Sequence, residues 1–142
     1  MGFVVALSAC VEGGALHEAQ RNVLGDPVEE CGPRAGGAVV TFDVLGERLM
    51  VWSTHAAFIR DAEKMLQGER PRIPVFERLL EGRDCDPQWS WHVDPAQMYW
   101  TEQAAELCDG SPSDVEGNKP YWFGRVKRFC PWDATVVGVE RR

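Results

Sequence analysis

Apolar and polar residues follow two different periods in the first part of the chain. Residues 38–44 and 48–53 are rich in β-branched and apolar residues and flank Gly46, which predicts a β-hairpin. Residues 55–67 instead carry apolar side chains at the spacing of one helix face. Thr54 precedes this segment and is the expected N-cap of the helix.

The later segments have weaker patterns. Residues 133–140 are β-branched and predict a closing strand. Residues 111–123 open with Ser-Pro-Ser-Asp, which is typical of a helix start, and Pro120 can shorten this helix. Residues 98–107 are ambiguous, because 102–107 favour a helix by intrinsic propensity. Together these elements predict one α+β domain with two helices on a mostly antiparallel sheet of about five strands.

The segment Trp-Ser-Trp-His-Val-Asp-Pro at residues 89–95 combines aromatic and titratable side chains. In an extended strand Trp89 and Trp91 point to the same face, and Pro95 directs the chain into a tight turn. Large aromatic side chains dominate the energetics of protein cores, so core packing followed by a turn is the simpler interpretation.

The alternative is a functional turn formed by Trp89, Trp91, His92 and Asp94. In this interpretation His92 and Asp94, joined by an acidic residue such as Glu102 or Asp109, would hold a proton or a metal ion. A hydrolase or metal-dependent enzyme centred on His92 and Asp94 would follow. The competing explanation is that both side chains hydrogen-bond the turn and neighbouring backbone groups.

The N-terminus resembles the end of a secretory signal. Residues 3–7 form a small apolar patch, and the sequence Leu-Ser-Ala-Cys at residues 7–10 resembles the lipobox of bacterial lipoproteins. This resemblance implies that residues 1–10 are a truncated signal peptide and that Cys10 is lipidated. The patch lacks a preceding basic residue and is short, which a start codon further upstream would explain. A buried N-terminal strand is the alternative.

The segment between this patch and the expected domain is rich in breakers. Residues 11–37 contain Gly-Gly, Gly-Asp-Pro and Gly-Pro steps, which predict a flexible tether. The folded domain is therefore expected to span residues 38–142.

The cysteines fit an exported protein. If Cys10 is the lipidation site, an even number of cysteines remains to form disulfides. These disulfide candidates are Cys31, Cys85, Cys108 and Cys130. No CxxC pair is present, so two disulfides in an oxidising compartment are favoured over a zinc site. We favour the pairs Cys31–Cys85 and Cys108–Cys130, although four cysteines allow three connectivities. Four buried thiols in a cytosolic protein are the alternative.

Composition limits the partners. The 142-residue chain has a net charge of −7, which disfavours nucleic acid, and no apolar run is long enough to span a membrane. Membrane attachment is therefore expected only through the N-terminal lipid. The histidines His17, His55 and His92 form no recognisable ligand set, and the acidic turn after Cys108 lacks the spacing of a calcium loop. We expect no cofactor and no metal ion.

Four blocks of the sequence form a recognisable set, at residues 89–95, 106–116, 121–122 and 129–132. Together they resemble a known family, the N-terminal-like domain of calmodulin-binding proteins, which occurs alone in many small bacterial proteins. The resemblance covers about residues 38–140. In close relatives the segment matching 101–107 is richer in β-branched residues, which implies a strand there.

The family name implies calmodulin as a partner, but the residues argue against it. Calmodulin targets are basic amphipathic helices, whereas this chain is acidic. Its one basic and aromatic stretch, residues 121–132, is interrupted by Gly124 and Pro131. The expectation is therefore a non-enzymatic, exported binding module, a monomer that recognises an unknown protein partner. A secreted protease inhibitor and the His92-centred enzyme are the alternatives.

Overall fold

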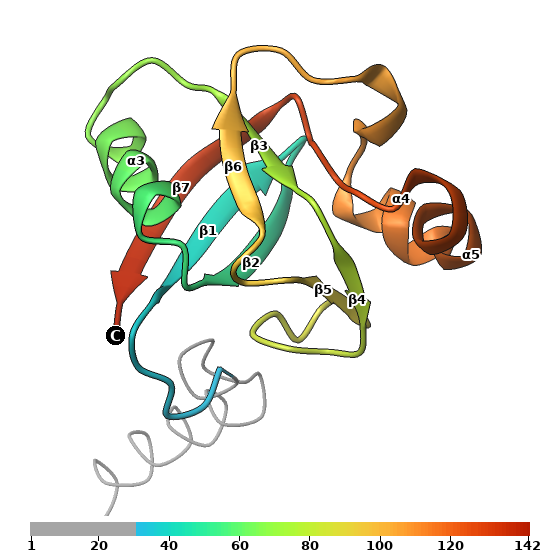
Figure 1. The fold of residues 1–142 in the computed structure, drawn as a ribbon, viewed down its shortest axis with the longest axis horizontal. Helices are drawn as coiled ribbons and strands as arrows, with labels where there is room; N and C mark the ends of the chain where they lie inside the picture. The colour runs from blue at the N-terminus through green and yellow to red at the C-terminus, as the bar shows by residue number, and fades with distance from the viewer. Residues whose placement is uncertain (1–30) are drawn as a thin grey trace, which may run out of the picture.

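The computed structural model describes residues 31–142, and within them helices and strands form a small α+β domain (Figure 1). All strand pairings are antiparallel. The strands are β1 Ala38–Val44, β2 Glu47–Ser53, β3 Ile73–Phe76, β4 Leu79–Glu81, β5 Trp91–Val93, β6 Met98–Thr101 and β7 Ala134–Arg141. The helices are α3 Ala56–Leu66, α4 Pro112–Gly117, α5 Lys119–Tyr121, the 3-10 helix η1 Glu106–Cys108 and the π-helix η2 Trp122–Val126.

The predicted hairpin forms the centre of the largest sheet. β1 pairs with β2 in full register from Ala38 opposite Ser53 to Val44 opposite Glu47, and β7 pairs on the other side of β1. The connecting residues Leu45 and Gly46 have φ values of 55° and 86°. Positive φ at both positions gives the backbone twist that suits a two-residue hairpin, and glycine adopts it without strain.

The expected single sheet of about five strands is wrong, because the strands divide into one group of three and two pairs. The pairs β3–β6 and β4–β5 are two halves of one bent ribbon. Between them Glu77 N donates to Gln97 O, and Asp94 N donates to Arg78 O, each at 3.0 Å. Two residues on one side of the ribbon therefore face four on the other, which bends it as a bulge does.

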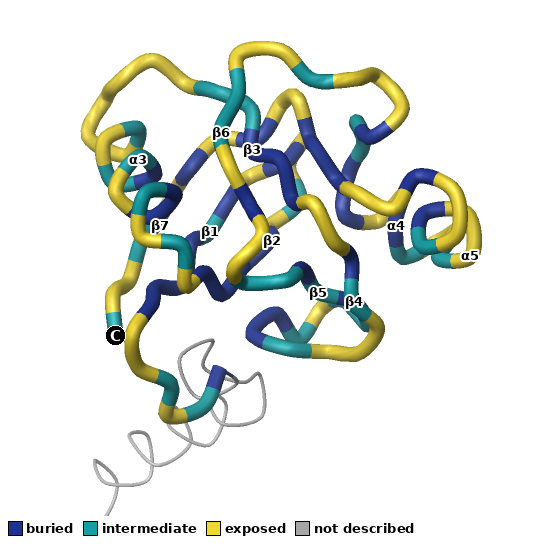
Figure 2. Tube along the Cα trace, in the orientation of Figure 1, coloured by how far each residue is buried: buried dark blue, intermediate teal, exposed yellow. Residues whose placement is uncertain are grey.

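The main core lies between this ribbon and the three-stranded sheet. Figure 1 shows the ribbon crossing in front of β1 and β2, with α3 at one side and α4 and α5 at the other. The buried positions in Figure 2 follow the middle of these strands. Phe76 lies at the centre, with its ring 5.8 Å from that of Phe42, 6.1 Å from that of Phe58 and 6.2 Å from that of Phe129.

The helix predicted at residues 55–67 is confirmed as α3, but His55 and not Thr54 caps it. The His55 Nδ1 atom accepts a hydrogen bond from the backbone N–H of Phe58 at 3.1 Å. Thr54 instead bonds the carbonyl of Pro95 through its own N–H at 2.9 Å. The threonine is therefore used to connect β2 to the bend of the ribbon.

Two segments with weaker sequence patterns differ from their predictions. The strand implied for residues 101–107 ends at Thr101, and a 3-10 turn follows at Glu106–Cys108. The alanines at positions 104 and 105 lack the side chains that stabilise an edge strand. The predicted helix at 111–123 starts where expected, with a capping box at Ser111, but α4 ends at Gly117, and Asn118 separates it from the short α5, which contains Pro120.

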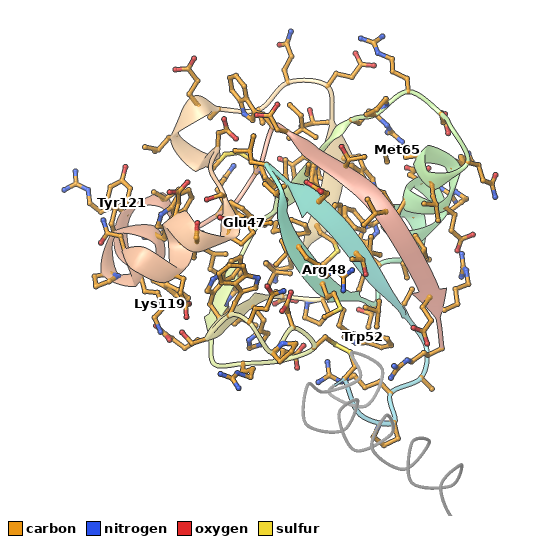
Figure 3. All side chains as sticks on the ribbon, turned by 180° about the vertical axis from the view of Figure 1, so that it is seen from behind. Glu47, Arg48, Trp52, Met65, Lys119 and Tyr121 are labelled. Carbon is orange, nitrogen blue, oxygen red and sulfur yellow. A yellow bond between two sulfur atoms is a disulfide. The ribbon has the colours of Figure 1, made fainter. Side chains whose placement is uncertain are left out.

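A second, smaller cluster covers the outer face of the sheet. Val39, Met50 and Trp52 are buried there against the disulfide between Cys31 and Cys85. Figure 3 shows Trp52 on this face, beside the segment that leads into β1. Residues 31–37, which the sequence assigns to the tether, therefore pack on the domain.

Two further contacts fasten this segment to the domain. The backbones of Gly36 and Gly37 exchange hydrogen bonds of 2.9 Å with Arg142, which joins the segment to the end of β7. A Cβ atom on Gly37 would lie 2.3 Å from Ser53 O, so no other residue fits that position.

Candidate functional site

The two tryptophans that the sequence singles out stabilise the fold. Trp91 is 1% exposed, and its ring contacts Phe129 edge to face at 5.6 Å. Trp89 packs partly buried against the same core although it precedes the strand, which begins only at Trp91, and its Nε1 donates to the Arg48 carbonyl at 3.2 Å. That bond and one from Met50 N to the buried Asp86 at 2.8 Å occupy the free edge of β2. Such contacts protect an edge strand from pairing with another chain.

His92 and Asp94 bond the backbone around them. The His92 Nδ1 atom lies 2.7 Å from the carbonyl oxygen of Gly82, and Asp94 Oδ1 accepts from Ala96 N at 3.0 Å. Asp109, suggested as a third member, accepts instead from Trp132 N at 2.8 Å. Residues 31–142 hold no group of three potential metal ligands. The geometry therefore matches the turn-bonding interpretation of these side chains, and their functional role stays a prediction.

A polar network that the sequence patterns did not reveal lies beside this segment. Ser90 donates its hydroxyl to the Glu116 carboxylate at 2.9 Å and accepts from Lys119 Nζ at 2.8 Å. A serine beside a lysine is one arrangement of a nucleophile and its base. Here Glu116 also binds the N–H of Ser90, and Glu81 lies 3.5 Å from the ammonium group. Glu116 thus holds Ser90 and Glu81 pairs with Lys119, which suits a structural link between β5 and α4–α5 better than catalysis.

Both predicted disulfide pairs are present, Cys31–Cys85 and Cys108–Cys130. Next to the first, Arg34 forms a two-pronged ion pair with Asp84 and lies over the Trp52 ring at 5.8 Å. The hydrogen bonds from Arg34 lower the pKa of Asp84, burial opposes them, and the positive charges of Arg34 and His92 add to the decrease. The carboxylate therefore favours the folded state only while it is ionised.

This ion pair predicts a dependence of stability on pH. Replacing Asp84 by asparagine should lower the free energy of unfolding at pH 7 by about 1 kcal/mol, because both side chains are partly solvated. A lowered carboxyl pKa stabilises the fold above its unfolded value of about 3.9, and this contribution is lost as pH falls through the lower folded value. Urea unfolding of the two proteins should therefore converge at low pH. Asp133→Asn, at an exposed carboxylate, is the matched control, and a constant difference down to pH 2 would contradict the assignment.

An exposed apolar surface surrounds the loop of residues 102–109. The disulfide Cys108–Cys130 fixes this loop, together with hydrogen bonds from Cys130 N to Cys108 O at 2.7 Å and from Trp132 N to Asp109. Leu107 is 61% exposed and Trp132 is 39% exposed. Two large apolar side chains are thus exposed to solvent on backbone that a disulfide and hydrogen bonds hold in place.

A shallow hollow lies on each side of the loop. One, of about 330 Å³, is lined by Ile73, Glu102, Gln103, Ala104 and Trp132. The other, of about 180 Å³, is lined by Ala105, Leu107, Cys108, Val126 and Arg128. We call the loop, Trp132 and both hollows the loop surface.

Comparison with known proteins identifies the family. A family model described as the N-terminal domain of calmodulin-binding protein 74 matches residues 37–142. This chain belongs to that domain family. The match confirms the resemblance to calmodulin-binding proteins and its extent. Searches of curated proteins and of solved structures found no match.

The blocks that resemble this family form the framework of the domain. Trp91, Cys108, Trp122 and Phe129 are all buried, and Ser111 caps α4. The blocks therefore indicate the fold. The loop surface overlaps two of the blocks, because residues 106–109 and Trp132 belong to them, and the sequence offered one signal for it, the expected disulfide between Cys108 and Cys130.

Several predictions concern residues that cannot be placed. The lipidation candidate Cys10, the apolar patch at 3–7 and His17 lie outside the described residues. None of the helices found from residue 31 onward has the length and apolar character needed to cross a bilayer.

Proposed function

We propose that this member of the calmodulin-binding-protein N-terminal domain family is a non-enzymatic, exported binding module that recognises a protein partner through the loop surface. One observation carries the proposal: a disulfide-fixed loop presents Leu107 and Trp132 to solvent beside two hollows. Tryptophan is enriched among the residues that contribute most to protein interfaces, and rigid presentation lowers the entropy lost on binding.

The environment of the polar side chains supports a binding role over catalysis. His92 is bonded to a backbone carbonyl, and the Ser90 hydroxyl is shared between Glu116 and Lys119. Neither group lines the two hollows of the loop surface. A catalytic base needs access to a substrate proton, and a nucleophile needs a base that is not already charged.

Export is the part of the proposal that the cysteines support. Two disulfides are typical of proteins that fold in an oxidising compartment. Lipidation of Cys10 would then attach the domain to a membrane surface. A protease inhibitor is a narrower version of the same proposal. It is less favoured, because the 3-10 turn at Glu106–Cys108 leaves only residues 102–105 between β6 and that turn for a protease to bind in an extended form.

Calmodulin is not the partner that this surface suits. In the stretch 121–132 the apolar residues Trp122, Val126 and Phe129 are buried in the core. An amphipathic target helix would have to present such residues to the calmodulin groove. Binding through this stretch would require the domain to unfold there.

A capture experiment with matched variants tests the proposal. The full chain, immobilised, is exposed to extracellular or periplasmic material of the source cell, and retained proteins are identified by mass spectrometry. The double variant Leu107→Ser, Trp132→Ser should lose the specific partner by about tenfold or more. Tyr99→Ser, at an aromatic residue that is 41% exposed elsewhere, should keep it.

The variant His92→Asn separates binding from the alternative enzyme. A partner retained by His92→Asn and lost by the loop variant supports the proposal. Equal retention by the loop variant, or turnover that disappears with the imidazole, would overturn it.

A further inference from the structure

The larger hollow of the loop surface has a chemistry of its own. Its lining combines the indole of Trp132 with the apolar side chains of Ile73 and Ala104 and with the polar side chains of Glu102 and Gln103. Within residues 31–142, the Glu102 carboxylate and the Gln103 carboxamide make no hydrogen bond or ion pair. A tryptophan, a carboxylate and an amide without internal partners therefore line one depression.

We propose that this hollow binds the guanidinium group of an arginine side chain presented by the protein partner. Cations are attracted to the face of an aromatic ring, most strongly to that of tryptophan. A planar guanidinium also stacks on the ring while donating hydrogen bonds to a carboxylate. The proposal rests on the proposed function, because it assigns the chemistry of the partner at the same surface.

The domain already contains the complete form of this arrangement. Arg34 lies over the ring of Trp52 at 5.8 Å and forms its two-pronged ion pair with Asp84. The larger hollow offers the tryptophan and the carboxylate without the arginine. On the outer sheet face of this domain an arginine thus lies between a tryptophan and a carboxylate, whereas the loop surface has the tryptophan and the carboxylate but no arginine.

Charge favours a cation in this hollow and not in the smaller one. Asp133 follows Trp132 in the sequence, and Asp109 accepts a hydrogen bond from the Trp132 N–H. The whole chain carries a net charge of −7. The smaller hollow contains Arg128, which would repel a guanidinium group. The position of Glu102 at the larger hollow thus sets which side of the loop receives the arginine.

Binding can be measured with a defined probe. The full chain, labelled with nitrogen-15, is titrated with acetyl-Gly-Arg-Gly-amide while the amide signals of residues 102–104 and the indole signal of Trp132 are followed by NMR. We expect saturable shifts at these signals in the millimolar range. The same peptide with citrulline in place of arginine keeps the shape but lacks the charge, and it should bind at least about fivefold more weakly.

Matched variants locate the site. Glu102→Gln should weaken the peptide about three- to fivefold, and Trp132→Leu should weaken it by a similar factor. Glu106→Gln makes the same charge change in the same loop but outside the lining, so it should leave binding unchanged. All four proteins should share the wild-type spectrum elsewhere, and Glu102→Gln at an exposed side chain avoids any effect on folding.

Three results would overturn the inference. They are the absence of saturable shifts, equal binding of the citrulline peptide, and equal weakening by Glu102→Gln and Glu106→Gln. Any of these outcomes, together with a partner that still depends on Leu107 and Trp132, would refute the arginine site and leave the proposed function standing. If the partner no longer depends on Leu107 and Trp132 but the peptide still binds, the proposed function is refuted and the arginine site stands.

Discussion

Replacing Phe76 by alanine should lower the free energy of unfolding by about 3–5 kcal/mol. Phe76 is fully buried, and its ring touches those of Phe42, Phe58 and Phe129, which belong to three other parts of the chain. Its backbone also exchanges hydrogen bonds of 2.8 and 3.0 Å with Phe129. Removing the ring leaves a cavity where the ribbon meets the sheet. A small domain has only about 5–15 kcal/mol in total, so urea unfolding followed by tryptophan fluorescence should detect the loss easily.

Two further variants serve as comparisons for the stability loss expected from Phe76→Ala. Phe76→Leu fills most of the cavity and should cost about 1–2 kcal/mol. Tyr99→Ala, on the neighbouring strand β6 but with an exposed side chain, should change stability by no more than about 0.5 kcal/mol. Similar losses for Phe76→Ala and Tyr99→Ala would mean that the core is not centred on Phe76.

The second large effect concerns the disulfides. Removing the Cys31–Cys85 bond by alanine at both positions should cost about 4 kcal/mol, and removing Cys108–Cys130 should cost about 3 kcal/mol. The order follows from the sequence separations of 54 and 22 residues, because a longer loop restricts the unfolded chain more. Urea unfolding without reductant measures both variants.

The reduced protein supplies the control. Dithiothreitol should destabilise the wild type but leave a variant without all four paired cysteines unchanged. A Cys31→Ala, Cys85→Ala variant as stable as the wild type would show that residues 31–37 do not contribute to the folded domain. The partner experiment with the Cys108–Cys130 variant would then show separately whether the loop needs its disulfide.

Local patterns predicted the elements whose causes are local. The β1–β2 hairpin follows from two apolar runs around Gly46, and α3 follows from one apolar face, so both were found with nearly correct bounds. The hairpin and α3 depend on few distant contacts. The even number of cysteines and the expected compartment predicted two disulfides, whereas the pairing was a choice among three connectivities that joins residues 54 and 22 positions apart.

The errors occur where distant residues decide. The bend of the ribbon depends on hydrogen bonds between residues 77–78 and 94–97, which no periodicity records. The choice of His55 as cap depends on Thr54 bonding Pro95, 41 residues away. The loop surface was missed for the same reason, because it brings Ile73, Glu102 and Trp132 together from three separate segments.

The course of β7 has a consequence for how this domain can be used. The strand starts two residues after Trp132 and finishes beside Gly36 and Gly37, so it runs from the loop surface to the place where both described chain ends meet (Figure 1). Eight extended residues span about 26 Å. A bead, a fluorescent label or a neighbouring module joined after Arg142 would thus lie at the end of β7 that is away from Trp132. Tethered in this way, the molecule would still face its target unobstructed.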